Sequence, residues 1–338
     1  MKTCLATAVA VTLGLTACQP RAPESAARID PVQLALFAPL PPAIETPDHP
    51  VTHAQASLRR LLFYETRLSR DHDLSCNSCH SLASYGVDHQ RVSNGAQGQR
   101  GTRNAPTVYN AAGHIAQFWD GRAATIEDQA KGPILNPIEM AMPSDRALLA
   151  ELSAIPAYLD AFQRAFPGEA NPVTYDNVGR AIGAFERRLV TPSPWDAFLE
   201  GDQNALTPAE KAGFNAFVAA GCHGCHNGAY LGGQMYQKAG LVTPWPDVSD
   251  PGRSAVTHQP ADRMVFKVPS LRNVAMTEPY FHNGRTQSLI EAVRMMGRYQ
   301  LGHDLTPAQV ELIVTYLETL TGRIPQGYVA QPQSPPSN

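Results

Sequence analysis

Two copies of the pattern Cys-x-x-Cys-His constrain this sequence more than any other feature. They read Cys76-Asn77-Ser78-Cys79-His80 and Cys222-His223-Gly224-Cys225-His226. In a c-type haem protein the two cysteines form thioether bonds to the haem and the histidine coordinates its iron. One copy alone could be half of a zinc site or a disulfide pair, but zinc needs further Cys or His ligands nearby. Two copies therefore predict two covalently bound haem c groups, with His80 and His226 as iron ligands.

The other two of the six cysteines lie within the first 18 residues. The first 18 residues contain the three parts of an export signal. These are Lys2, an apolar stretch from Leu5 to Leu15, and small residues before the cleavage site at Cys18. We expect a lipoprotein-type signal peptide over residues 1–17; a plain secretory signal is the alternative. The apolar stretch is shorter than the roughly 20 residues of a membrane helix. We therefore expect a periplasmic protein whose only membrane attachment is a lipid anchor at Cys18.

Composition and the positions of helix-breaking prolines suggest how the chain is divided into domains. Its 338 residues suffice for two domains, and its net charge of -3 offers no basic surface for nucleic acid. Residues 18–50, rich in Pro and Ala, are expected to form a tether, and residues 326–338 a flexible tail. Two prolines, Pro192 and Pro194, interrupt any helix between the halves. We place an N-terminal haem domain at 51–190 and a C-terminal haem domain at 191–325.

Helix signals dominate between these boundaries. A Thr followed three residues later by Glu or Gln predicts helix starts at Thr52, Thr207 and Thr306. Apolar patterns predict further helices over 146–165 (interrupted at Pro156), 175–189 and 287–297. Strand-like alternation is sparse, and 29 prolines with 25 glycines imply long loops. The predicted fold is mainly α: two cytochrome c-like domains, each wrapping one covalently bound haem, with long loops and little β.

From residue 63 to residue 322 the sequence resembles the bacterial diheme cytochrome c peroxidases. The matching segments, besides the first motif, are Arg67-Leu68-Ser69, Arg103-Asn104-Ala105-Pro106-Thr107-Val108, Phe118-Trp119-Asp120-Gly121-Arg122-Ala123, Gln129-Ala130-Lys131-Gly132-Pro133, Glu139-Met140, Pro269-Ser270-Leu271-Arg272-Asn273-Val274, Pro279-Tyr280-Phe281-His282 and Met296-Gly297. They span about three quarters of the chain, and the joint pattern is highly specific.

The resemblance assigns roles around the first haem, which is the peroxidatic one in that family. It implies that Glu139 is the distal acid/base and that Gln129 is its amide partner. Phe118 and Pro133 correspond to residues that shape the pocket. Trp119 corresponds to the aromatic residue between the two haems, which supports electron transfer from one to the other.

The resemblance also assigns ligands elsewhere. The family's second haem has a His/Met pair, which puts Met296 on that iron beside His226; adjacent methionines face different directions, so Met295 is not the ligand. Asn104, Thr277 and Pro279 correspond to a calcium site built from oxygen atoms. Family members are often homodimers, so a homodimer is expected by analogy.

One position departs from the family pattern. Classical members carry a His in a Ser-x-Gly-His-Gly loop that caps the first haem in the oxidised enzyme, and reduction of the second haem releases it. Here the loop reads Ser93-Asn94-Gly95-Ala96-Gln97-Gly98. Ala96 cannot coordinate iron, so we expect a first haem that is open at rest. His89 is the alternative cap from the same loop.

These features predict an enzyme, a cytochrome-c peroxidase that reduces hydrogen peroxide to water. Its electrons would come from a small periplasmic donor, a cytochrome c or a cupredoxin. An alternative is a diheme enzyme that oxidises residues of a partner protein, as the methylamine-utilisation enzyme does; that enzyme also lacks the loop His but carries Tyr where Met296 stands. A further alternative is an electron carrier or redox sensor without turnover.

Overall fold

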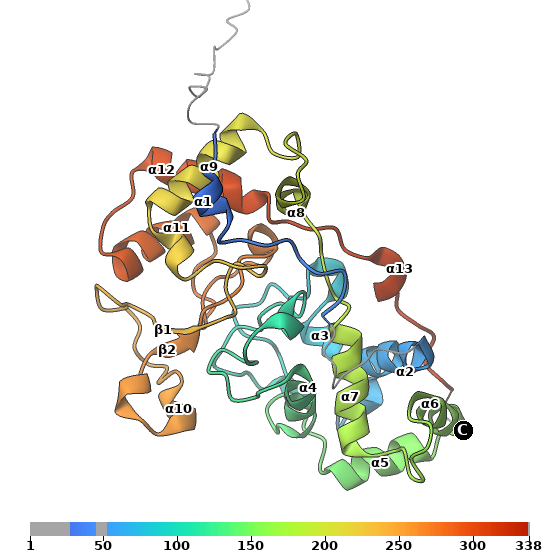
Figure 1. Cartoon of the computed structure of the whole chain (residues 1–338). Helices are drawn as coiled ribbons and strands as arrows, with labels where there is room; N and C mark the ends of the chain where they lie inside the picture. The colour runs from blue at the N-terminus through green and yellow to red at the C-terminus, as the bar shows by residue number, and fades with distance from the viewer. Residues whose placement is uncertain (1–27, 45–52, 337–338) are drawn as a thin grey trace, which may run out of the picture.

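The computed structural model describes residues 28–44 and 53–336, with the backbone alone for 53–57. The signal peptide, Cys18 and the predicted helix cap at Thr52 lie outside the described residues. Within these ranges the protein is mainly helical, as expected, with one short antiparallel pair of strands, β1 (Tyr236–Lys238) and β2 (Val265–Lys267) (Figure 1). The longer helices are α2 (His53–Tyr64), α4 (Ile126–Leu135), α5 (Asp145–Ser153), α6 (Pro156–Ala165), α7 (Tyr175–Glu186), α9 (Pro208–Ala219) and α12 (Pro307–Glu318). The shorter ones are α1 (Pro31–Leu34), α3 (Cys76–Cys79), α8 (Pro194–Leu199), α10 (Ser254–Thr257), α11 (Leu289–Met295) and α13 (Gln326–Val329).

Local sequence signals set several helix ends. Thr207 caps α9, because its hydroxyl accepts from the backbone N–H of Glu210 at 3.3 Å while the Glu210 carboxylate accepts from the N–H of Thr207 at 2.6 Å. Thr306 and Gln309 form the same capping box at α12. Pro156 begins α6 and separates it from α5, because proline fits the first turn of a helix and not its interior. No helix among the described residues is both long and apolar enough to cross a membrane.

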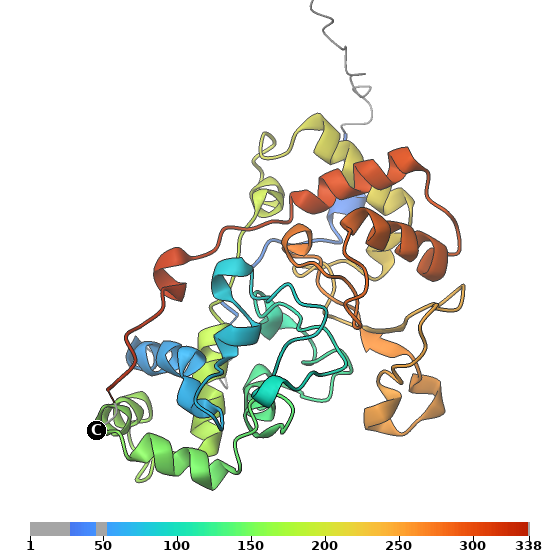
Figure 2. The same cartoon turned by 180° about the vertical axis from the view of Figure 1, so that it is seen from behind.

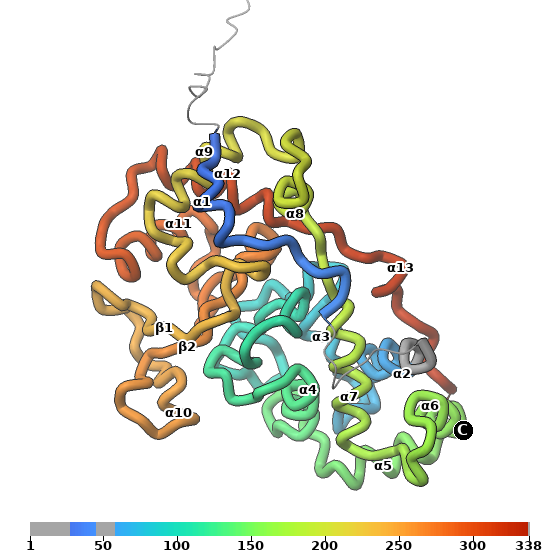
Figure 3. The backbone as a smooth tube through the Cα atoms, in the orientation of Figure 1, coloured from blue at the N-terminus to red at the C-terminus, as the bar shows by residue number. Residues whose placement is uncertain are grey.

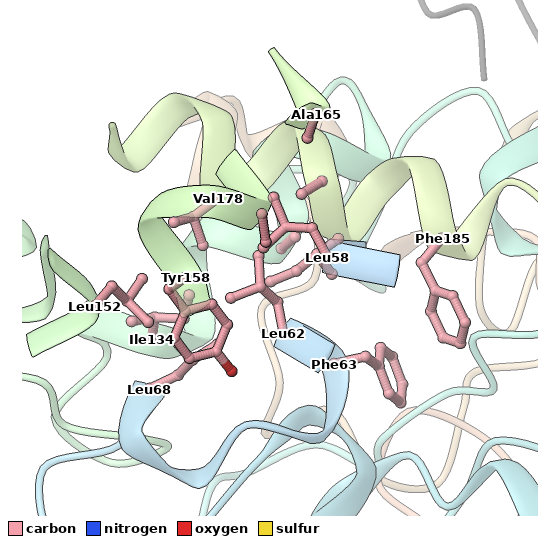
Figure 4. Close-up of a cluster of buried hydrophobic side chains, with 14 of the residues drawn as sticks. Leu58, Leu62, Phe63, Leu68, Ile134, Leu152, Tyr158, Ala165, Val178 and Phe185 are labelled. Carbon is pink, nitrogen blue, oxygen red and sulfur yellow. The ribbon is translucent and has the colours of Figure 1, made fainter. Parts of the chain in front are cut away.

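The helices surround two hydrophobic cores. The first lies among α2, α4, α5, α6 and α7, whose buried side chains interdigitate (Figure 4). The second lies among α8, α9, α11 and α12 and contains Trp195, Phe214 and Tyr316. Helices α9 and α12 cross closely at Gly213, where a Cβ would lie 2.2 Å from the carbonyl oxygen of Leu312. A larger residue at 213 would therefore force these helices apart.

The described N-terminal segment packs on the second core (Figure 3). Phe37 is buried there, with its ring centroid 5.7 Å from that of Trp195 and 5.3 Å from that of Phe214. The backbone N–H of Leu40 donates to the Asp196 carboxylate at 2.8 Å. Residues 28–44 thus differ from the expected tether, because Phe37 is buried in the second core and Leu40 and Ile44 pack with Val190 of the N-terminal half.

The C-terminal segment makes the reciprocal contact with the first core. Ile324 and Val329 belong to that core, and the Tyr64 hydroxyl donates to the Val329 carbonyl at 2.6 Å. The Tyr328 ring stacks on Phe185 with centroids 4.9 Å apart. Residues 326–336 were expected to be a flexible tail, whereas their aromatic and apolar side chains hold them on the N-terminal half.

Loops from the two halves meet between the groups of helices, the teal and orange segments in the view from behind (Figure 2). Two turns in these loops share one backbone form, namely Phe118-Trp119-Asp120-Gly121-Arg122 and Phe281-His282-Asn283-Gly284-Arg285. Flanking residues pair across each turn, 117 with 123 and 280 with 286, and the Phe has a φ of 67° in both. The rings of Trp119 and His282 face each other edge to face, with centroids 6.4 Å apart. The two turns are thus a structural repeat, and their Trp119 and His282 rings touch.

Candidate haem-binding site

One cavity of about 440 Å³ reaches both Cys-x-x-Cys-His motifs. Its lining includes Cys76, Cys79, His80, Cys222, Cys225 and His226. All four cysteines are free thiols, so none is engaged in a disulfide. The lining also includes Trp119, Gln129, Glu139 and Met296. The predicted attachment residues and the predicted catalytic residues therefore surround one connected space.

The first motif is held in one short helical turn. Helix α3 begins after Ser75, whose side chain forms a capping box with Ser78, and it ends at His80. The Nδ1 atom of His80 lies 3.3 Å from the carbonyl oxygen of Gly86. This contact favours the proton on Nδ1 and leaves Nε2 as a free lone pair. Burial lowers the pKa of His80, so the ring is neutral, which is the form that coordinates iron.

The second motif repeats this arrangement. The Nδ1 atom of His226 lies 3.1 Å from the carbonyl oxygen of Leu231. Burial lowers the pKa of His226 to about 4, so this ring is also neutral at neutral pH. Each motif thus presents two thiols and an oriented neutral imidazole to the cavity. These groups fit the attachment and iron coordination of haem c.

The two adjacent methionines have different surroundings. Met296 lines the cavity, whereas the sulfur of Met295 accepts a hydrogen bond from the Thr286 hydroxyl at 3.4 Å. The predicted helix over 287–297 stops being α-helical at this point: α11 ends at Met295, and a π-helical segment runs over Met296–Leu301. Such segments are frequent at functional sites. Of the two residues, Met296 is the one on the cavity wall.

Glu139 is a half-buried carboxyl held by its own loop. The Asn136 side-chain amide donates to Oε1 of Glu139 at 2.8 Å, and the backbone N–H of Ala96 donates to the Glu139 carbonyl at 2.7 Å. Burial raises the pKa of Glu139, and the charge of Arg122 and the hydrogen bond from Asn136 oppose this rise without cancelling it. The carboxyl therefore exchanges its proton closer to neutral pH than an exposed glutamate does.

A second cavity of about 480 Å³ adjoins the first at Glu139. Phe118, Arg122, Pro133 and Glu139 line both cavities. The Arg122 guanidinium lies 3.4 Å above the centre of the Phe118 ring, and its side chain is 40% exposed. Glu139 thus stands where an outer cavity meets the inner one, which is a suitable position for a group that moves protons on a small molecule.

The loop of Ala96 packs directly on the Glu139 loop. The Ala96 side chain is buried, and a Cβ on Gly95 would lie 1.9 Å from the carbonyl oxygen of Ile138. Only glycine permits so close an approach of the two backbones. His89, from the same loop, turns elsewhere: its Nδ1 lies 3.1 Å from the carbonyl oxygen of Glu278, and it is not part of the described cavity lining.

Trp119 is fixed from both halves of the chain. Its indole N–H donates to the Asn104 carbonyl at 2.9 Å, and its own carbonyl accepts from the N–H of Lys267 at 2.8 Å. The N–H of Asn104 in turn donates to the His282 carbonyl at 2.8 Å. Gln129 lies on α4 and reaches the same cavity. Trp119 is therefore held at the seam between the halves.

The residues assigned to calcium also line the cavity, namely Asn104, Thr277 and Pro279. The described residues include no group of three or more His, Cys, Asp or Glu side chains that could hold a metal ion. A calcium ion here would depend on amide and backbone oxygens, and Asn104 already donates its side-chain N–H to the Gln90 carbonyl at 2.9 Å.

Several site residues were given no role by the sequence. Asn136 precedes Glu139 by three residues in an Asn-Pro turn, a spacing that could have indicated a side-chain contact within the loop. Arg122 lies within a matching segment. Lys267 and His114 meet at the cavity wall from positions 153 residues apart, and no local signal connects them.

Comparison with known proteins identifies the class. Residues 53–204 match the family model described as di-haem cytochrome c peroxidase. The cytochrome c551 peroxidase of Pseudomonas aeruginosa is 47% identical over 299 residues, with 86% of each chain covered. That of Nitrosomonas europaea is 46% identical over 286 residues, with 84% of each chain covered. A solved MauG-like protein associated with microbial copper homeostasis is 28% identical and has a TM-score of 0.78, over 87% of this chain and 97% of that one.

Two c-type motifs around one cavity, carried by a mainly helical fold, are the features of a protein that holds two haems. The chain belongs to the di-haem cytochrome c peroxidase family. The predicted family and the predicted enzyme class, cytochrome-c peroxidase, are confirmed by these relatives. Membership implies two haem c groups as cofactors.

Proposed function

We propose that this protein reduces hydrogen peroxide to water with electrons from a small periplasmic donor, a cytochrome c or a cupredoxin. The observation that carries the proposal is the position of Glu139, a half-buried carboxyl at the junction of two cavities, one of which contains both haem-attachment motifs. The identity of 47% with a cytochrome c551 peroxidase supports the same activity.

Bound haem iron would supply the redox chemistry of O–O cleavage; the side chains supply the proton movements. Glu139 takes a proton from one oxygen of the peroxide and delivers it to the other oxygen, which leaves as water. Asn136 holds the carboxyl through its bond to Oε1, and Gln129 is the proposed hydrogen-bond partner of the substrate. With two electrons and two protons, one peroxide yields two water molecules.

His226 and Met296 would together hold the iron of the haem attached at Cys222 and Cys225. Trp119 is the proposed electron path between the two haems, because it lies on the cavity wall and is fixed by residues of both halves. Residues 51–190 would form the peroxidatic domain and residues 191–325 the electron-transfer domain. Asn104, Thr277 and Pro279 remain the proposed calcium ligands.

Replacement of Glu139 tests the catalytic assignment. Glu139→Gln removes the proton acceptor, so kcat/KM for peroxide should fall by about 10²–10⁴ while both haem spectra persist. In the unaltered protein kcat/KM should also fall as the pH drops through the raised pKa of Glu139, because only the ionised carboxylate accepts the first proton. Glu200→Gln removes an exposed carboxylate and should change neither kcat/KM nor its dependence on pH. Full activity in Glu139→Gln would contradict the assignment.

We also propose that the first haem is open in the fully oxidised protein. Ala96 offers no ligand, and the contacts of its backbone with the Glu139 loop give the loop a packing role instead. Electron paramagnetic resonance of the oxidised protein should show one high-spin iron and one low-spin His/Met iron. Two low-spin signals, one of them bis-His, would mean that a histidine such as His89 caps the first haem.

Oxidation of a partner protein is the second candidate, favoured by the structural similarity to a MauG-like protein. Met296 on the cavity wall argues against it. Steady-state assays with reduced cytochrome c separate the candidates: peroxide-dependent oxidation of the donor supports the peroxidase. An electron carrier or sensor would show no turnover, with or without reduction beforehand. We further propose export to the periplasm, a lipid anchor at Cys18 and a homodimer.

A further inference from the structure

Lys267 is a buried cation on the cavity wall. It is the last residue of β2, and its side chain crosses to the N-terminal half, where Nζ donates to the Ala116 carbonyl at 2.8 Å and lies 3.2 Å from Nδ1 of His114. Among the described residues no carboxylate lies within ion-pair distance of it. An ammonium group has three N–H donors, so one of them has no partner in the part of the chain that the structure describes.

His114 presents a second such donor. The Nε2 atom of its ring is buried, and burial together with the charge of Lys267 lowers the pKa of His114 well below the ordinary value. The neutral ring accepts from Lys267 at Nδ1, so its proton is on Nε2, which has no partner among the described residues. Gly233 makes room for the ring, because a Cβ there would lie 2.2 Å from it. Lys267 and His114 thus bring two unpartnered donors to one wall of the cavity.

An uncompensated charge at this depth is costly. Removing an ammonium group from water costs several kcal/mol unless an opposite charge is near. Burial accordingly lowers the pKa of Lys267 to about 8. The described protein supplies no counter-charge, but the cofactor that the motifs imply carries two carboxylates. An anion in the cavity would pair with the ammonium group and accept from the imidazole.

The strand pair also lies beside the second motif. The Gln237 side chain on β1 hydrogen-bonds the Cys225 thiol, and β1 pairs with β2. Two residues beyond Lys267, the Pro269 carbonyl hydrogen-bonds His226. We propose that Lys267 and His114 bind a carboxylate of the second haem, with Lys267 as its counter-charge. This inference depends on haem occupying the cavity, as in the proposed function.

The site makes the potential of the second haem depend on pH. A nearby positive charge favours reduced iron, which carries one positive charge fewer than oxidised iron. The charge is present below the pKa of Lys267 and is lost above it. Burial alone puts this pKa at about 8, and pairing with the haem carboxylate raises it, so the potential should fall as the pH rises above 8 through the raised pKa. The groups facing Lys267 do not titrate there: His114 is neutral, and burial raises the pKa of Tyr230, whose ring lies against His114.

Potentiometric titration of the holoprotein from pH 6 to pH 10, followed by haem absorbance, tests the site. Lys267→Met should lower the potential of the second haem at pH 6 and abolish its fall with pH. Lys267→Arg keeps the charge at all these pH values, so the potential should stay high and flat. Lys211→Met removes a surface cation of the same half and should behave like the unaltered protein.

Haem content, measured by the pyridine haemochromogen assay, comes first. If Lys267→Met retains both haems and an unaltered potential at pH 6, Lys267 is not a counter-charge and the inference is wrong. If that variant does not retain haem, Lys267→Arg decides: a potential that still falls beyond pH 8 overturns the inference, and a flat one supports it. The potential is measured without peroxide turnover. A protein that shows no turnover would therefore contradict the proposed function but not the assignment of Lys267 and His114.

Discussion

At the scale of single residues, surroundings distinguish side chains of identical chemistry. Met295 and Met296 are neighbours, yet the sulfur of Met295 is engaged by Thr286 and Met296 reaches the cavity. A thioether ligand favours ferrous iron and so raises a haem potential, whereas an imidazole ligand lowers it. Which methionine lies on the cavity wall therefore bears directly on the potential of the second haem.

Met296→His should lower the potential of the second haem and slow donor oxidation, because imidazole stabilises ferric iron more than a thioether does. Redox titration of the purified holoprotein measures the first effect, and stopped-flow mixing with reduced cytochrome c measures the second. Met295→Leu is the matched control and should leave the potential in place. An unchanged potential in Met296→His would mean that Met296 is not an iron ligand.

Sequence alone predicted the residues whose chemistry demands fixed spacing. The cysteines and histidine of each motif must be close in the chain because the two thiols bond to one haem and the imidazole must reach the iron of the same haem. Glu139, Gln129 and Trp119 came from the family resemblance, and the structure places them on the same cavity. The contact between Lys267 and His114 joins distant segments and depends on the folded chain, so no local pattern could have indicated it.

At the scale of elements, α4 is joined to α7 and to Arg187, the residue directly after α7, by two ion pairs of very different burial. Glu127 and Arg187 form a double hydrogen bond at 2.7 and 2.9 Å, and both side chains are at most 7% exposed. Lys131 and Asp176 lie 3.1 Å apart on the surface. The contribution of a buried ion pair to stability can therefore be compared with that of an exposed pair in the same region.

Glu127→Gln should lower the free energy of unfolding by about 3–5 kcal/mol, because it leaves the buried Arg187 charge without a full partner. Asp176→Asn should cost about 1 kcal/mol or less, since water screens that pair. Urea denaturation followed by far-ultraviolet circular dichroism measures both. Equal effects of the two substitutions would show that burial does not set the contribution of the pair.

The elements themselves were largely predictable, and their junctions less so. Capping boxes at Thr207 and Thr306 and the break at Pro156 are local, so the sequence shows them directly. The change to π-helix at Met296 is not, because α-helical and π-helical turns share the same local preferences and packing decides between them. The repeated turns at Phe118 and Phe281 went unrecognised because only three of their five residues are identical.

At the scale of the whole molecule, each end of the described chain packs on the core formed mainly by the other half. Phe37 belongs to the second core, and Ile324 and Val329 belong to the first. Neither segment is long or periodic enough to predict such docking from sequence. Their apolar residues looked like isolated members of a tether and a tail, and only the folded partner surfaces give them a place.

Tyr328→Ala should destabilise the first core by about 1–3 kcal/mol, because it removes a half-buried ring stacked on Phe185 and its hydrogen bond to the Phe185 carbonyl. Amide hydrogen exchange should accelerate in α2 and α7 and remain slow in α9 and α12. Gln331→Ala, at an exposed position of the same segment, should have no effect. Unchanged exchange in α7 would show that the segment does not support that core.

The reciprocal packing of the ends also fixes the order in which the halves can be completed. The second core has all its buried residues once residue 320 is available, whereas the first must wait for Val329. Domains generally fold as units while the chain is synthesised from its N-terminus. Here the half that is made first is finished last, so its final packing coincides with the arrival of the C-terminal residues.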